Sequence, residues 1–129
     1  MSANTIVSQK AHICVVDDDS LLRDSIQRLL RSFGFRVEIF ASAEEFWNSG
    51  YLAETACLIL DVRMPGMSGI ELHRQLVASH YEIPVIFITA YEDEGMRAQA
   101  LREGAGALLI KPFSEHALIN AINEALSSK

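Results

Sequence analysis

Cysteine is scarce in this sequence, and both examples, Cys14 and Cys57, lie inside short apolar runs. A buried cysteine packs as a small hydrophobic residue, so we predict core positions for both rather than a disulfide or a metal site. Such usage fits a reducing cytoplasm. Long apolar runs are also missing, because none approaches the roughly 18 residues that a membrane-spanning helix needs.

Positive charge is in short supply as well. The 11 Lys and Arg residues are outnumbered by 17 Asp and Glu residues, which leaves a net charge of -6 at pH 7 and argues against a nucleic-acid-binding surface in this segment. The first residues are polar and lack the basic and then apolar layout of a secretory signal. We expect residues 1–10 to be a flexible leader and residues 11–127 to form one domain.

Short apolar runs bounded by turn signals predict strands that are buried on both faces. They cover residues 12–16, 36–40, 57–60, 84–88 and 107–110. After each run, apolar residues recur with helical spacing. The positions that we expect to face the core from these helices are Leu22, Ile26, Leu29, Leu30, Phe33, Phe46, Trp47, Leu72, Leu76, Val77, Met96, Ala100, Leu101, Leu118, Ile119, Ile122 and Leu126.

Capping residues mark where these helices begin and end. Asp19 or Ser20 can cap the first helix, and Gly34 closes it in the left-handed conformation. Ser42 and Ser68 each stand three residues before a glutamate, which is the capping-box spacing. Strict alternation of strands and helices predicts an α/β fold with a parallel sheet covered on both faces. Five strands fit the flavodoxin-like, doubly wound order 2-1-3-4-5.

Polar side chains stand where four of the predicted strands end. They are Asp17, Asp18, Asp61, Thr89 and Lys111. In an open parallel sheet the carboxyl ends of the strands share one edge, and ligands bind there beside the switch in strand order. Three carboxylates held close together repel one another, and a hard divalent cation such as Mg²⁺ removes the conflict. Acids that only cap helices would not require a lysine from a distant strand.

A carboxylate beside Mg²⁺, an ammonium group and a hydroxyl is suited to accept a phosphoryl group. The metal and Lys111 would neutralise charge on the oxygens of the transferring group. Thr89 would donate a hydrogen bond to the group once it has arrived. The product would be an aspartyl phosphate.

Four motifs follow one another along the chain: Val15–Asp19, Leu60–Gly69, Ile88–Ala90 and Lys111–Phe113. In this order and spacing they resemble the receiver domain of two-component response regulators, over about residues 11–127. The stretch Asp61–Gly69 is most similar to the FixJ-like branch, whose members usually carry a DNA-binding domain after the receiver. The sequence leaves open whether the chain is a single-domain regulator or a receiver taken from a longer one.

The resemblance implies a role for each residue of the site. Asp61 would be the phosphoacceptor, and it would ligate Mg²⁺ together with Asp18 and the backbone carbonyl of Arg63. Asp17 would act mainly through a water molecule. Thr89 would be the switch hydroxyl, and Lys111 would bind the phosphate before a cis Lys111–Pro112 bond. The domain would be a switch that assists its own phosphorylation and dephosphorylation rather than an enzyme.

One position departs from the family pattern, and two others are variable. Three residues before the lysine the family usually has Tyr or Phe, whereas this chain has Leu108, which we interpret as filling a core or surface pocket. Signal would then pass chiefly through the loop after Thr89 and the weakly packed fourth helix. Arg63 and Tyr91 could lean over the phosphoryl site and hinder water, or could simply be exposed.

The resemblance also implies partners. A histidine kinase or histidine phosphotransfer protein would supply the phosphoryl group and dock near the site, using the first helix. Phosphorylation would shift the face made by the fourth helix, the fifth strand and the last helix. That face would then meet an output domain or protein, or a second copy of the chain. No nucleic acid or membrane is expected to bind this domain.

Two alternatives come from other classes. A pseudo-receiver would keep the fold as an interaction module that never takes phosphate, although the intact acids, hydroxyl and lysine argue against it. A small phosphatase of the haloacid-dehalogenase kind is loosely suggested by Asp17–Ser20. The chain is short for that family and lacks a late acidic pair.

Overall fold

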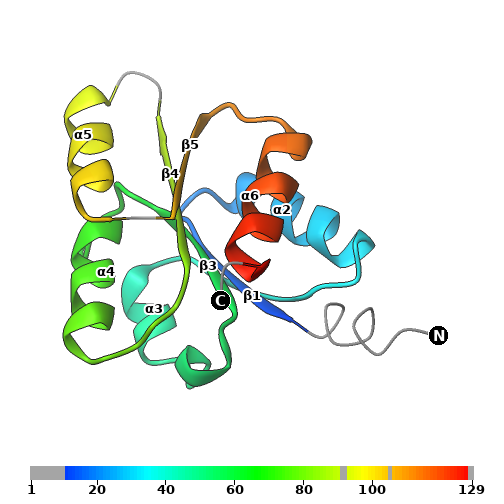
Figure 1. Cartoon of the computed structure of the whole chain (residues 1–129), viewed down its shortest axis with the longest axis horizontal. Coiled ribbons are helices and arrows are strands. Elements are labelled where there is room, and N and C mark those ends of the chain that lie inside the picture. Colours follow the sequence, from blue (N-terminus) through cyan, green and yellow to red (C-terminus); the bar gives the residue numbers. More distant parts are fainter. Residues whose placement is uncertain (1–10, 91–92, 105, 128–129) are drawn as a thin grey trace.

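The fold is a five-stranded parallel sheet between two layers of helices (Figure 1). The computed structural model describes residues 11–90, 93–104 and 106–127, so the predicted leader and Tyr91 lie outside the described residues. The strand order is β2-β1-β3-β4-β5, which confirms the predicted flavodoxin-like topology. The strands are β1 (His12–Val16), β2 (Arg36–Phe40), β3 (Cys57–Asp61), β4 (Val85–Ala90) and β5 (Ala107–Lys111).

The helices alternate with the strands, and they divide between the two faces of the sheet. With the labels of Figure 1 they are α2 (Ser20–Ser32), α3 (Ala43–Trp47), α4 (Gly69–Ala78), α5 (Glu94–Arg102) and α6 (Glu115–Ser127), with a short 3₁₀ turn η1 at Leu52–Glu54. The helices α3, α4 and α5 cover one face, and α2 and α6 cover the other. No helix of the described segments is both long and apolar enough to cross a bilayer.

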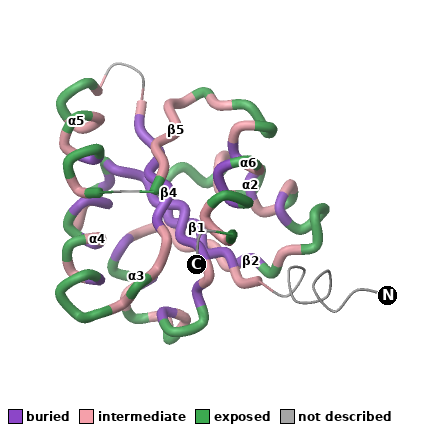
Figure 2. Tube along the Cα trace, viewed as in Figure 1, coloured by how far each residue is buried: buried purple, intermediate pink, exposed green. Residues whose placement is uncertain are grey.

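The core lies on both sides of the central strand β3, all of whose residues are buried. Figure 2 shows this buried centre and the exposed outer surfaces of the helices. Side chains alternate along each strand, so Cys14 and Val16 face the α3–α4–α5 layer while Ile13 and Val15 face α2 and α6. Cys14 and Cys57 are buried and form no disulfide, which confirms the packing role predicted for them.

Three residues that we predicted to face the core do not. Phe33, Val77 and Leu101 are 54%, 58% and 65% exposed. Val77 and Leu101 each follow a residue that already takes the buried position, and one step along an α-helix turns the next side chain by about 100°. Phe33 lies past the last turn of α2, as its C-cap. These three predictions were therefore wrong.

The helix caps mostly follow the prediction. Asp19, not Ser20, caps α2, because its carboxylate accepts hydrogen bonds from two backbone N–H groups of the first turn. Gly34 has φ 90°, in the left-handed region. Ser68 forms a complete capping box. At Ser42 the serine accepts from the backbone of Glu45, but the Glu45 carboxylate accepts from the N–H of the residue before the cap, so this box is incomplete.

Candidate functional site

Three carboxylates meet at the carboxyl edge of the sheet, as predicted. Asp61 is the last residue of β3, and Asp17 and Asp18 directly follow β1, the neighbouring strand. One carboxylate oxygen from each lies within 4.8 Å of the others. Asp17 is fully buried and Asp61 is 5% exposed, whereas Asp18 is exposed. The site is therefore a mostly buried acidic cluster with one side open to solvent.

Lys111, the last residue of β5, is the cation of this cluster. Its Nζ lies 3.3 Å from Asp17 Oδ2 and 3.6 Å from Asp61 Oδ2. The peptide bond between Lys111 and Pro112 is cis, as the resemblance implied. Lys111 is thus brought to the two buried acids from the edge of the sheet, across β4. One positive charge faces three carboxylates, so negative charge remains in excess.

Thr89 lies one residue before the end of β4, beside Ile110 of β5 in the strand register. It is 2% exposed, and its hydroxyl has no hydrogen-bond partner among the described residues. Asp17 Oδ2 likewise lacks a hydrogen bond within that part of the chain, although it is paired in charge with Lys111. Buried polar atoms without partners are costly, so this edge of the sheet suits a ligand that satisfies them.

The pKa values of the site reflect its crowding. Burial raises the pKa of Asp61 to about 7, and the charge of Asp17 acts in the same direction. Lys111 and the N–H of Arg63, which lies 3.3 Å from Asp61 Oδ1, oppose the rise. Burial lowers the pKa of Lys111, but the charges of Asp17 and Asp61 outweigh it, and the pKa is raised. Additional positive charge near Asp61, such as a bound cation, would therefore favour its ionised form.

This arrangement predicts how stability varies with pH in the metal-free protein. The folded chain holds the Asp61 proton up to about pH 7, whereas the unfolded chain loses it near 3.8. Between these values the folded state binds more protons, so the free energy of unfolding falls as pH rises and levels off above about 7. From pH 5 to pH 8 we expect the wild type to lose about 2 kcal/mol relative to Asp61→Asn. Urea unfolding with a chelator present measures the difference in the free energy of unfolding between the two proteins. A difference that does not change with pH would contradict the raised pKa of Asp61.

The loop after Asp61 is held by backbone contacts that fix the site. Gly69 donates its N–H to the Val62 carbonyl at 2.9 Å, and a Cβ at Gly69 would overlap the Asp61 carbonyl oxygen. The Glu44 carboxylate of α3 accepts a hydrogen bond from the Met67 N–H at 2.9 Å. This role of Glu44 could not be predicted, because no local sequence pattern indicates a contact with a residue 23 positions away.

Gly69→Ala is expected to displace this loop, because its methyl group meets backbone rather than a flexible side chain. We expect a loss of stability on the order of 3 kcal/mol, measured by urea unfolding. Gly95→Ala is the matched control. Gly95 is the second residue of α5 and has open space around its Cα, so alanine there should change the stability by less than about 0.5 kcal/mol. Equal stabilities of the two variants would show that the close contact between residue 69 and the Asp61 carbonyl oxygen does not limit the stability of the fold.

Comparison with known proteins gives the family of this chain. A family model described as the response regulator receiver domain matches residues 13–123. The chain belongs to this family. It is therefore a receiver domain of two-component signalling, and Asp17, Asp18 and Asp61 form its acidic phosphoacceptor pocket. A receiver domain of this kind is not an enzyme in the usual sense.

Individual relatives agree with the family assignment. The response regulator protein TmoT of Ectopseudomonas mendocina is 42% identical over 118 residues, which are 92% of this chain and 54% of that protein. The transcriptional regulatory protein FixJ of Bradyrhizobium diazoefficiens is 37% identical over 120 residues, 93% and 58% of the two chains. The chain thus spans about half the length of the curated relatives it matches.

Solved structures show the same receiver fold. A structure of the response regulator StyR has a TM-score of 0.84 and 47% identity, covering 92% of this chain and 60% of that one. A crystal structure of FixJ-N also has a TM-score of 0.84, with 34% identity and coverage of 93% and 96%. These likenesses confirm the predicted similarity to the FixJ-like branch.

The structure shows how Leu108 of β5 packs. Leu108 is half-buried and packs against the core beneath α3, α4 and α5, which confirms the interpretation as a pocket-filling residue. Arg63 extends to Asp93, the N-cap of α5, and forms two hydrogen bonds with its carboxylate, at 2.8 and 3.2 Å. The prediction for Tyr91 lies outside the described residues.

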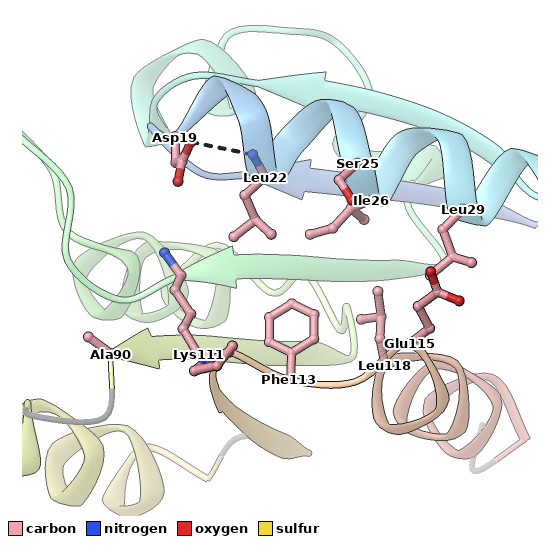
Figure 3. Close-up of a pocket in the computed structure, with 11 residues that line it drawn as sticks. Asp19, Leu22, Ser25, Ile26, Leu29, Ala90, Lys111, Phe113, Glu115 and Leu118 are labelled. Carbon is pink, nitrogen blue, oxygen red and sulfur yellow. Dashed lines mark hydrogen bonds between the residues drawn. The ribbon is translucent and has the colours of Figure 1, made fainter.

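A cavity of about 520 Å³ adjoins the acidic pocket of the receiver. It lies between α2 and the connection from β5 to α6, and Lys111 stands at one end (Figure 3). Leu22, Ile26 and Leu29 line it from α2, opposite Phe113 and Leu118. A largely apolar groove thus leads away from the site along the first helix.

Proposed function

We propose that the chain accepts a phosphoryl group on Asp61 in a Mg²⁺-dependent reaction and thereby changes the face made by α5, β5 and α6. The observation that carries this proposal is the cluster of three carboxylates within 4.8 Å, with the Lys111 ammonium 3.6 Å from Asp61. The altered face would engage an output domain or protein, or a second copy of the chain.

The donor set fits Mg²⁺. Its atoms are carboxylate oxygens, which a hard divalent cation prefers, and the buried Asp17 Oδ2 has no hydrogen-bond partner within the described residues. Asp18, Asp61 and the backbone carbonyl of Arg63 would hold the ion directly, and Asp17 would act through water. When bound, the ion supplies positive charge for the oxygens of the phosphoryl group.

The protein's own groups would divide the remaining work. An Asp61 carboxylate oxygen forms the new bond to phosphorus while the bond to the leaving group breaks. Lys111 attracts the phosphoryl oxygens from a position already fixed by Asp17 and Asp61. Thr89 has a buried hydroxyl without a partner in the described chain, and it would donate a hydrogen bond to the transferred group. Burial of Asp17 and Asp61 limits the access of water to the reacting oxygen.

The donor and the output are part of the same proposal. A histidine kinase or histidine phosphotransfer protein would supply the phosphoryl group, docking beside α2, where the apolar groove opens. Curated relatives are about twice as long as the matched segment, which supports an output domain in a longer regulator. The cysteines form no disulfide, in keeping with a cytoplasmic location.

Incubation with acetyl phosphate tests the proposal. With Mg²⁺ present, intact-mass spectrometry should show one added phosphoryl group, and a chelator should prevent its addition because the crowded carboxylates then lack their cation. No incorporation with Mg²⁺ would favour the pseudo-receiver alternative. Steady turnover of a generic phosphomonoester would instead favour the phosphatase alternative.

A further inference from the structure

The helix α5 is tied to its surroundings by ion pairs at both ends. At its start, the Asp93 carboxylate accepts two hydrogen bonds from Arg63. At its end, the C-cap Glu103 accepts two from Arg74 of α4, at 3.0 and 2.7 Å. Between these ends, Ala100 is the only buried residue of α5. Met96 is half-buried and packs against the core beside it, so α5 is held by a narrow apolar contact together with ion pairs at both of its ends.

Arg63 joins the start of α5 to the phosphoacceptor. Its backbone N–H donates to Asp61 Oδ1 at 3.3 Å, while its guanidinium group binds Asp93. Arg63 thus contacts both the phosphoacceptor Asp61 and the N-cap residue Asp93 of α5. The pairing lowers the pKa of Asp93, so its carboxylate stays ionised and remains a partner for Arg63 at neutral pH.

A phosphoryl group on Asp61 would place a second anion within reach of this guanidinium. Phosphate groups carry a charge of about -1.5 to -2 near neutral pH, and arginine binds them in the same forked geometry as a carboxylate. The Arg63 side chain is 70% exposed, so its packing against the described residues leaves it room to reorient. The Asp93 side chain is 18% exposed, so the pair is partly open to solvent, and a phosphoryl group with its higher charge would compete with a single carboxylate for the guanidinium group.

We propose that phosphorylated Asp61 competes with Asp93 for Arg63, and that loss of the Arg63–Asp93 pair releases the first turn of α5. This inference rests on the proposed function and adds the route by which the site reaches the α5 face. Arg63 is a positioning residue in this scheme, because it acts on α5 through Asp93.

Beryllofluoride, a phosphoryl mimic, tests this competition for Arg63 in the full chain with Mg²⁺ present. Because coupling is reciprocal, Asp93→Asn should make the chain bind beryllofluoride about 2- to 5-fold more tightly, as expected from the strength of a partly exposed ion pair. Asp93 makes no side-chain capping hydrogen bond and asparagine is tolerated at N-cap positions, so the substitution removes the ion pair without removing a cap. Arg63→Ala should weaken binding, and the double variant should match Arg63→Ala. NMR titration measures all four affinities.

Glu103→Gln is the matched control, because it weakens the ion pair at the opposite end of α5. It should leave the affinity for beryllofluoride unchanged. Hydrogen exchange gives a second readout at the Arg97 amide, whose N–H donates to the Asp93 carbonyl and closes the first turn of α5. Beryllofluoride should speed exchange of this amide in the wild type, and Asp93→Asn should show the faster exchange without beryllofluoride.

The outcomes separate the two proposals. If acetyl phosphate labels Asp61 but Asp93→Asn binds beryllofluoride like the wild type, the proposed competition for Arg63 is wrong and the proposed function stands. If Glu103→Gln tightens beryllofluoride binding as much as Asp93→Asn, general loosening of α5 explains the effect and the proposed competition for Arg63 is again wrong. If the wild type takes up neither acetyl phosphate label nor beryllofluoride, both proposals fail.

Discussion

Asp61→Asn is expected to abolish phosphoryl incorporation from acetyl phosphate. The amide has nearly the shape of the carboxylate, but it lacks the anionic oxygen that would form the acyl phosphate bond. Because the variant also removes a carboxylate whose pKa is raised to about 7, it should fold at least as stably as the wild type. Intact-mass spectrometry after a fixed incubation measures the loss.

Asp24→Asn is the matched control for this variant. Asp24 is exposed on α2, so the change removes the same charge without touching the acidic pocket. Its incorporation should equal that of the wild type. Labelling of Asp61→Asn at the wild-type level would show that another residue is the acceptor.

Lys111→Met is expected to slow phosphoryl incorporation by roughly 100-fold, which is typical when one preorganised electrostatic group is removed from a reacting centre. Methionine keeps a long unbranched side chain but brings no charge to oxygens that now lie 3.3 and 3.6 Å from the ammonium. The two buried carboxylates then lose their cation, and the transferring phosphoryl group meets more negative charge. Initial rates at saturating Mg²⁺ give the measurement.

Arg28→Met provides the control for general loss of positive charge. Arg28 is exposed on α2, so its incorporation rate should stay within about twofold of the wild type, as expected for a surface change. If Lys111→Met reacts as fast as Arg28→Met, the lysine has no part in phosphoryl transfer.

The sheet and the acidic cluster could be predicted because both follow from short-range patterns. Apolar runs that stop at a polar residue give the strands, and the topology of a parallel sheet then brings Asp17, Asp61 and Lys111 to one edge. Val77 and Leu101 were predicted to face the core, but both are exposed. Periodicity gives the general face of a helix but not where the buried stripe ends.

The supports of the site were harder to predict. Glu44 holds the loop at Met67, and Asp93 binds Arg63, through contacts between residues 23 and 30 positions apart. Such contacts depend on how the finished layers pack, and the sequence around each acid shows only a helix start. The motif contains Gly69, but the overlap of a Cβ with the Asp61 carbonyl oxygen becomes visible only in three dimensions.

The most direct measurement is to locate the phosphoryl group after reaction with acetyl phosphate and Mg²⁺. Borohydride reduction converts an aspartyl phosphate into homoserine, and peptide mapping then identifies the position. We expect the modified residue to be Asp61, with Asp17 and Asp18 unchanged. Modification at another residue, or a stable phosphate on a serine or threonine, would contradict the account.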